Sequence, residues 1–341
     1  MAVPRDLSPY DLLIKVAVAS NCHTDLLVLQ GMFKPTLPCT ASHEGSGTVV
    51  AVGADVKEFA VGDRVMCGLP YKPCGICMDC LGPEAQRHYC ANVGGHCGVL
   101  MDGFFADYAI TDSRSSTPIP DEVTFESAAP LACAGRTIWR GVTLANLKKG
   151  EWIALVGSGG GLGHLGIQFA KALGLNVVGI DARDDGLTLS KETGADVVLD
   201  ARKGKEYLVK EVQKVTGGQG VDCAVIISDA QNAAAIACSV TKMHGTAVQI
   251  AQPAEVSIPF AEFIFRDIRV KGSLLCSPEE SKAMLRVVAE HGIKVKTNPF
   301  YGLDKITELV ELVHKGTIQG KAIIIVDEEQ IKKEKEIGAK Y

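Results

Sequence analysis

Residues 152–181 read WIALVGSGGGLGHLGIQFAKALGLNVVGID, and this stretch decides the fold predicted for the chain around it. The apolar run at 152–156 is typical of a buried parallel strand, and the glycine-rich run at 157–163 is typical of a tight turn. Apolar residues then recur at helical spacing, and a second apolar run at 177–180 ends in Asp181. Strand, glycine turn, helix, strand and acid, in this order, predict the βαβ unit that binds a dinucleotide.

The glycine turn and the acid predict where the two halves of such a cofactor lie. Glycines let the backbone approach a pyrophosphate, and the N–H groups at the start of a helix receive its charge. Asp181 stands where a carboxylate accepts hydrogen bonds from both ribose hydroxyls and repels a 2′-phosphate, which favours NAD over NADP. Arg183, two residues later, keeps NADP as the alternative. The residues expected along the cofactor are Gly157, Gly160, Gly161, Leu162 and Gly163.

Composition sets broad limits on the class of protein. The chain has 341 residues, of which 47% are hydrophobic and 22% charged, enough for two domains with full cores. A net charge of −5 without a long basic run argues against nucleic acid or a membrane surface as partner. No apolar run approaches the length of a membrane span and no signal peptide is recognisable at Met1, so we expect a cytoplasmic protein.

Four of the twelve cysteines are clustered in a way that predicts a metal site. Cys74, Cys77 and Cys80 form two overlapping C-x₂-C units, and Cys90 follows. Four thiolates at this spacing suit a tetrahedral, structural Zn²⁺. An iron–sulfur cluster is the alternative, because its ligand runs also use C-x₂-C-x₂-C, and His88 is the alternative to Cys90 as fourth ligand.

The rest of the chain divides into a β-rich part and an α/β part. Short strands punctuated by glycine and aspartate predict a partly open barrel, with strands expected at 12–18, 48–52, 56–59, 62–66 and 102–109. A helix is expected from Pro130, and helices and strands then alternate to Leu274 as in a doubly wound parallel sheet. Within that part a helix is expected at 232–243. Helices at 278–291 and 303–315 and a strand at 321–326 follow, and the charged tail 328–341 is expected to be a solvated or frayed helix.

Five motifs occur in an order that resembles one enzyme family. They are N-C-H-T-D at 21–25, H-E-G-x-G at 43–47, the four-cysteine segment, P-L-x-C-A-G-x-T at 130–137 and the glycine turn. The chain resembles the zinc-dependent alcohol dehydrogenases of the medium-chain dehydrogenase/reductase superfamily, the yeast-type enzymes most of all. The resemblance implies an α/β fold in which a Rossmann doubly wound sheet is joined to a GroES-like, partly open-barrel domain. It places the catalytic zinc-binding domain at 1–137 and 278–341 and the dinucleotide-binding domain at 138–277.

The resemblance also implies roles for residues that spacing alone does not connect. Cys22, His43 and Cys133 correspond to the ligands of a catalytic zinc, with Glu44 beside the metal and Asp25 orienting His43. Thr24 corresponds to the hydroxyl that takes the alcohol proton, and His23 to the residue that relays this proton and contacts a cofactor phosphate. Thr137 corresponds to the threonine that packs against the nicotinamide. Lys321 stands where the family commonly places a cation on the pyrophosphate.

The function implied is reversible hydride transfer between an alcohol and NAD(H), with zinc as Lewis acid, two zinc ions per chain and a homodimer or homotetramer. Phe33 and Pro70 stand where yeast-type enzymes have tryptophans, so we expect a larger substrate pocket that accepts longer or aromatic alcohols and aldehydes. The family usually has further residues before this chain's start, whose absence would expose a strand edge. The alternatives are an NADPH-dependent aldehyde reductase of the same family and a non-catalytic nucleotide-binding protein.

Overall fold

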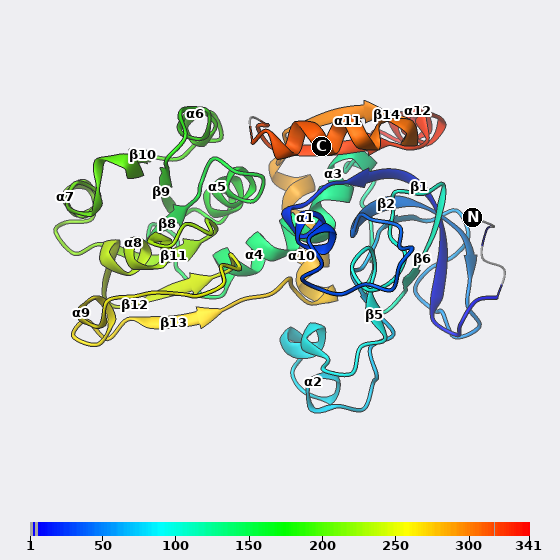
Figure 1. The fold of residues 1–341 in the computed structure, drawn as a ribbon, viewed down its shortest axis with the longest axis horizontal. Coiled ribbons are helices and arrows are strands. Elements are labelled where there is room, and N and C mark those ends of the chain that lie inside the picture. Colours follow the sequence, from blue (N-terminus) through cyan, green and yellow to red (C-terminus); the bar gives the residue numbers. More distant parts are fainter. Residues whose placement is uncertain (1–2, 4–5, 317) are drawn as a thin grey trace. The chain divides into compact units, whose positions relative to one another are not determined.

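The computed structural model describes Val3, residues 6–316 and residues 318–341, and its chain forms two compact units (Figure 1). Unit 1 comprises Met1–Arg136 and Leu275–Tyr341, and unit 2 comprises Thr137–Leu274. The sequence places these two boundaries one and three residues later. In the described part of the chain, no helix has both the length and the apolar character needed to cross a bilayer.

Unit 2 is the doubly wound parallel sheet predicted from the glycine turn, and this prediction is confirmed. Six strands pair in the order β10-β9-β8-β11-β12-β13, all parallel. Their bounds are β8 (Trp152–Val156), β9 (Asn176–Asp181), β10 (Val197–Asp200), β11 (Val221–Ile226), β12 (Thr241–Gln249) and β13 (Arg269–Gly272). The strand order reverses between β8 and β11, and ligands of such sheets bind at the carboxyl ends of the strands where the order reverses.

The helices of unit 2 pack in two pairs, α5 with α6 and α7 with α8. From β8 the chain crosses over to β9, and from β11 it crosses over to β12, in the opposite direction along the sheet. Because both crossovers are right-handed, the two helix pairs lie on opposite faces of the sheet. The buried core between them consists mainly of aliphatic residues from the central strands and from α8. The helix bounds are α4 (Arg136–Thr143), which enters the unit, α5 (Gly163–Ala172), α6 (Asp184–Glu192), α7 (Lys205–Val215), α8 (Ala233–Val240) and α9 (Phe260–Phe263).

Unit 1 is built around one long strand, β1 (Asp11–Ser20). It pairs antiparallel with β2 and β15 and, along its first half, with β6. The sheet order is β14-β15-β1-β2-β3-β7, so the strand from near the chain's start is central and is flanked by one from near its end. The other strands are β2 (Glu44–Val52), β3 (Arg64–Met66), β6 (Tyr108–Asp112), β7 (Thr117–Pro118), β14 (Thr297–Tyr301) and β15 (Lys321–Ile325), with a separate pair β4 (Pro70–Tyr71) and β5 (Gly95–His96).

Short helices connect the strands of unit 1, and longer ones follow in its C-terminal segment. Their bounds are α1 (His23–Leu29), α2 (Met78–Leu81), α3 (Phe125–Pro130), α10 (Pro278–His291), α11 (Ile306–His314) and α12 (Glu328–Glu336). The β-rich character predicted for this part of the chain is confirmed.

The sequence prediction was wrong in four places. Residues 56–59 are irregular rather than a strand, and they follow a turn in which the Val56 N–H donates to the Gly53 carbonyl. In 102–109 only the last two residues are strand, because Gly103 and Phe104 donate to a loop at residues 40–42. Helix α8 ends at Val240, since the chain from 241 pairs with β11.

The tail at 328–341 is the fourth difference, since it is docked on unit 1 rather than solvated. Helix α12 buries Gln330, Ile331 and Glu334. The Gln330 amide donates to the carbonyls of Lys15 and Val16 in β1. Because the sequence of this helix is so rich in charge, the single buried stripe did not stand out as amphipathic.

Candidate metal and dinucleotide sites

Three strand ends meet in unit 1 and bring together residues that are distant in sequence. The antiparallel register pairs Ser20, the last residue of β1, with Glu44, the first of β2. On the other side of β1, Asn21 donates to the Ala322 carbonyl at the start of β15. Cys22 and His43 therefore leave the same edge of the sheet side by side.

The third ligand arrives on an irregular helix. Helix α3 continues into a π-helical turn, Leu131–Gly135, which contains Cys133. The Ala134 N–H donates to Oε1 of Glu44 at 3.1 Å, which fixes this turn against β2. The potential ligand atoms of the strand-end cluster, Cys22, His43, Glu44 and Cys133, all lie within 4.8 Å of one another.

The Asp25 carboxylate supports the strand-end cluster through hydrogen bonds. It accepts hydrogen bonds from the Cys22 N–H at 2.7 Å and from the Ser42 N–H at 3.2 Å, and it lies 3.2 Å from Nδ1 of His43. The other ring nitrogen, Nε2, is buried and has no hydrogen-bond partner among the residues that the structure describes. Two sulfurs and a buried, unpartnered imidazole nitrogen are the donor set that Zn²⁺ prefers, so the residues fit a metal ion.

The charges around the cluster favour a thiolate. The hydrogen bond from Cys133 and the nearby Lys321 ammonium hold the pKa of Cys22 well below its ordinary value. Burial raises the pKa of Glu44 to about 7, although the Lys321 charge opposes that rise. The Lys321 ammonium lies 2.7 Å from Oε2 of Glu44, and the side chain of the lysine is only 5% exposed.

This ion pair shows what Lys321 contacts in the described structure, where its ammonium is buried against Glu44. The predicted contact of Lys321 with the cofactor pyrophosphate stays a prediction. The strand explains the placement, because Lys321 opens the apolar run of β15 and faces the start of β2 across β1. No local sequence signal predicts the pair, because only the strand order β15-β1-β2 brings Lys321 near Glu44.

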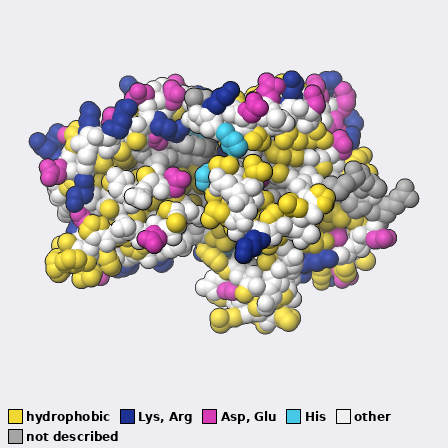
Figure 2. All heavy atoms as spheres, in the orientation of Figure 1, with side chains coloured by type: hydrophobic (Ala, Val, Ile, Leu, Met, Phe, Trp, Pro, Cys, Tyr) yellow, Lys and Arg dark blue, Asp and Glu magenta, His cyan; other side chains and the backbone are white. Residues whose placement is uncertain are grey.

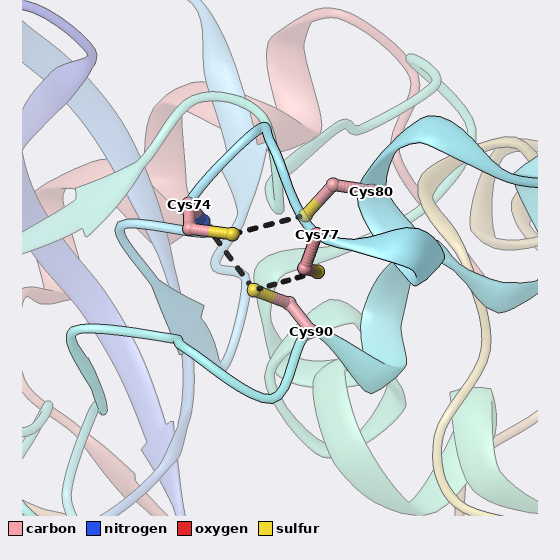
Figure 3. A group of neighbouring side chains, drawn as sticks. All are labelled: Cys74, Cys77, Cys80 and Cys90. Carbon is pink, nitrogen blue, oxygen red and sulfur yellow. Dashed lines mark hydrogen bonds between the residues drawn. The ribbon is translucent and has the colours of Figure 1, made fainter.

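The four-cysteine lobe, residues 74–90, is a second group of potential metal ligands (Figure 3). The sulfurs of Cys74 and Cys80 are 4.0 Å apart, those of Cys77 and Cys90 are 3.8 Å apart, and the Cys74 N–H points to the Cys90 sulfur at 3.3 Å. The structure thus places Cys90 in the group, whereas His88 stacks on Tyr89. Four sulfurs from so short a segment fit a tetrahedral metal ion.

The glycine turn in unit 2 is shaped for close approach of a ligand. Gly157 has a φ of +99°, and a Cβ there would lie 2.9 Å from the Ser228 nitrogen. A Cβ on Gly159 would lie 2.0 Å from Gly186 of α6, which explains the additional glycine in the motif. Gly160 differs, since a Cβ on it would meet nothing nearer than 3.6 Å, so its backbone borders open space. Helix α5 begins at Gly163 without a side-chain cap, so its first N–H groups, apart from that of His164, which donates to the Gly160 carbonyl, can receive an anion.

Asp181, at the end of β9, closes this turn. Its carboxylate accepts hydrogen bonds from the N–H groups of Gly159, at 2.9 Å, and of Arg183, at 3.0 Å. The Arg183 guanidinium donates in turn to the Gly159 carbonyl at 3.1 Å, and about half of this side chain is exposed. Asp181, which is expected to bind the ribose, therefore also fixes the glycine turn, and the Arg183 guanidinium lies beside it.

The other predicted residues lie at several places. Thr24 and His23 are in the first turn of α1, next to Cys22, with Thr24 partly buried and His23 exposed. Thr137 is the first residue of unit 2 and is nearly buried. Phe33 lies in the exposed loop after α1.

Pro70 lies in β4, between the barrel strands and the four-cysteine lobe. It borders a cavity of about 630 Å³ beside the lobe, which no residue of the strand-end cluster lines. The predicted pairing of Pro70 with Phe33 in one substrate pocket stays a prediction.

Comparisons with known proteins bear on both units. Residues 8–121 match the family model of the alcohol dehydrogenase GroES-like domain, and residues 161–290 match that of the zinc-binding dehydrogenases. An alcohol dehydrogenase of Geobacillus stearothermophilus is 35% identical over 327 residues, covering 94% of this chain and 92% of the relative.

Two solved structures add the fold. The alcohol dehydrogenase of the hyperthermophilic archaeon Aeropyrum pernix superposes with a TM-score of 0.84 at 30% identity, covering 95% of each chain. A zinc-binding dehydrogenase of Sinorhizobium meliloti 1021, solved with NADP bound, superposes with a TM-score of 0.81 at 26% identity, covering 95% of this chain and 94% of that one.

Proposed function

This chain belongs to the zinc-dependent, medium-chain alcohol dehydrogenases, and we propose that it interconverts alcohols and carbonyl compounds with NAD(H) and two zinc ions per chain. The observation that supports this most directly is the strand-end cluster. Cys22, His43 and Cys133 meet there, and the buried Nε2 of His43 has no partner among the described residues. The second zinc belongs to the four-cysteine lobe, where it is structural.

The residues of the strand-end cluster have distinct tasks. Zinc held by Cys22, His43 and Cys133 supplies a Lewis acid for the alcohol or carbonyl oxygen. Asp25 fixes the His43 ring through Nδ1, so that Nε2 is presented to the metal. Glu44 is held by Lys321 and by the Ala134 N–H, which keeps a carboxylate close to two thiolates without an unpaired buried charge.

Proton transfer follows from the two residues after Cys22. Thr24 is partly buried beside the cluster, and its hydroxyl accepts the proton that the alcohol loses. His23 is exposed at the same helix start and passes that proton to solvent. A Thr24→Val enzyme is expected to lose most of its turnover, whereas His23→Gln is expected to shift the pH dependence of turnover.

NAD(H) supplies or accepts the hydride, and Asp181 favours it. The carboxylate would accept hydrogen bonds from the ribose hydroxyls, and its charge would repel a 2′-phosphate. The second candidate is an NADPH-dependent reductase, favoured by Arg183, whose half-exposed guanidinium lies 3.5 Å from Asp181. The NADP bound to the Sinorhizobium relative shows that this fold accommodates NADP.

The substrate proposal rests on Phe33. A phenylalanine in place of an indole leaves more room beside the loop after α1, so longer or aromatic alcohols are the expected substrates. Benzyl alcohol and hexanol should then exceed ethanol in kcat/KM. The opposite order would contradict the proposal.

We also propose a homodimer or homotetramer in the cytoplasm. β13 ends the sheet of unit 2, its four residues are exposed, and it pairs only with β12 among the described strands. Figure 2 shows hydrophobic side chains gathered over the adjoining α9 region, where Phe260, Ile264 and Phe265 are exposed. An open edge beside apolar side chains suits a second copy. The cytoplasm is supported by the twelve cysteines, none of which forms a disulfide.

Zinc content per chain, measured together with NADH and NADPH oxidation on a panel of aldehydes, tests the proposal. Two zinc ions and faster NADH oxidation are expected. Two zinc ions with faster NADPH oxidation would favour the second candidate. One zinc ion and no turnover would leave a nucleotide-binding protein without a catalytic centre.

A further inference from the structure

The C-terminal segment contacts the helix that leads to a proposed zinc ligand. Glu334 of α12 is only 3% exposed, and its Oε2 accepts hydrogen bonds from the Phe125 N–H at 2.7 Å and from Arg64 at 2.6 Å. Phe125 is the first residue of α3, whose first N–H groups have no acceptor within the helix. A carboxylate from the far end of the chain therefore satisfies the start of α3.

Main-chain bonds from the last residues reinforce this contact. The Thr124 N–H donates to the Tyr341 main-chain oxygen at 2.6 Å, and the N–H groups of Lys340 and Tyr341 both donate to the Glu122 carbonyl at 2.9 Å. Arg64 completes the arrangement by donating to the Val123 carbonyl at 2.6 Å. The segment 122–125 is thus held from two directions.

Other contacts of helix α3 connect it to the proposed metal ligands of the strand-end cluster. Ser46 of β2 donates to the Phe125 carbonyl at 2.7 Å, two residues after Glu44 in the same strand. Eight residues after Phe125, Cys133 lies in the π-helical turn that the Ala134 N–H fixes on Glu44. The chain from Phe125 to Cys133 is helical throughout, so a displacement at its start moves the thiolate.

We propose that the C-terminal segment, residues 328–341, positions Cys133 for metal binding, with Glu334 as the principal positioning residue. This inference rests on the proposed catalytic zinc site. Glu334 touches neither metal nor substrate, and it acts by fixing the start of α3 and with it the distance of Cys133 from Cys22 and His43. The four-cysteine lobe, which has no described contact with α12, serves as an internal reference in the same molecule.

The test measures release of the two metals from the full-length holoenzyme with a coloured chelator, together with the visible spectrum of cobalt at the strand-end cluster. Glu334→Ala should release the metal of this cluster roughly tenfold faster than wild type and alter the cobalt–thiolate bands, with unchanged release from the lobe. Glu336→Gln is the matched control, because it alters an exposed acid of the same helix. Removal of residues 340–341 should act in the same direction with a smaller effect.

Loss of general stability must be separated from positioning. Leu309→Ala removes a fully buried side chain of α11, which packs on β15, and it lowers the melting temperature without removing a hydrogen bond at the start of α3. If metal release follows the melting temperature alike in Leu309→Ala and Glu334→Ala, the inference is overturned. The same holds if Glu334→Ala keeps the wild-type rate and cobalt spectrum. A wild-type chain that binds metal only at the lobe would overturn the proposed catalytic site itself.

Discussion

The four-cysteine lobe and the strand-end cluster both bring sulfur ligands to one point, but the chain builds them differently. The lobe takes all its ligands from residues 74–90, and its helix α2 buries no residue. Figure 2 shows hydrophobic side chains at the surface of the lobe, where Ile76, Met78 and Leu81 are exposed. The strand-end cluster takes its ligands from three segments and has a buried carboxylate, a buried lysine and a sheet behind it. A metal is therefore expected to maintain the lobe, whereas the protein maintains the cluster.

The largest expected effect comes from removing one ligand of the strand-end cluster. Cys133→Ser should lower turnover roughly a thousandfold, because Lewis-acid catalysis is worth several kcal/mol. The fold and the lobe metal should remain, so metal analysis should give one zinc per chain. Cys39→Ser, which alters a partly buried thiol outside both groups, is the control and should retain turnover and both metals. A Cys133→Ser protein that keeps two zinc ions would contradict the ligand assignment.

The next effect concerns the buried ion pair behind the cluster. Lys321→Met leaves the Glu44 carboxylate buried without its cation, and we expect the free energy of unfolding to fall by about 2 kcal/mol. Lys321→Arg keeps a cation and should lose much less. Urea unfolding of the two variants side by side measures the difference. Equal stability of the methionine variant and wild type would mean that the pair does not support the cluster.

A smaller effect is expected for the lobe. Cys77→Ser should release one zinc and open residues 74–90 to proteases, because few buried contacts hold this segment. The free energy of unfolding of the rest of the chain should change by about 1 kcal/mol or less, since local opening leaves the two cores intact. Turnover by the protein that retains the other zinc should persist. Loss of both metals together would show that the two groups are not independent.

The smallest expected effect is a pH-dependent change in melting temperature at Asp327, which precedes helix α12 of the docked tail. Burial by itself raises the pKa of Asp327, but hydrogen bonds from Lys15 and Gln330 outweigh it and hold this pKa below its ordinary value. Such a group stabilises the folded state above the unfolded pKa of about 4, and this contribution is lost as the pH falls through the folded value. Wild type should therefore melt about one degree above Asp327→Asn at pH 6 and together with it near pH 2, since exposed pairs contribute little. A constant difference at all pH values would contradict this reasoning.

The two metal groups also differ in how far the sequence predicted them. Spacing alone indicated the lobe, because its four cysteines are close in sequence. Cys22, His43 and Cys133 were joined only by family resemblance, since their meeting depends on the register of β1 with β2 and on the π-helical turn. The ion pair of Lys321 with Glu44 was not predicted, because no local pattern reveals that a lysine in β15 faces Glu44 across β1.

The same contrast holds for the fold. The glycine turn and the alternating apolar runs of unit 2 predicted its doubly wound parallel sheet, because the pattern of each strand and helix is local. The tail was predicted to be solvated, because burial of Gln330 and Glu334 depends on polar partners in β1, β3 and α3. Local patterns describe local contacts, and polar side chains that are buried only through distant partners remain hidden from them.

The pairing of β1 with β15 has a consequence for biosynthesis. Val18 lies opposite Ile325, so β1 can complete its pairing only after residues more than three hundred positions later have been synthesised. Unit 2 is continuous in the chain and can fold as soon as it leaves the ribosome. During translation the nascent β1 and β2 present an open edge, which is a hazard for association with other nascent chains. The proposed metal site lies where β1, β2 and β15 meet, so we expect the strand-end cluster to be complete only after β15 has been synthesised.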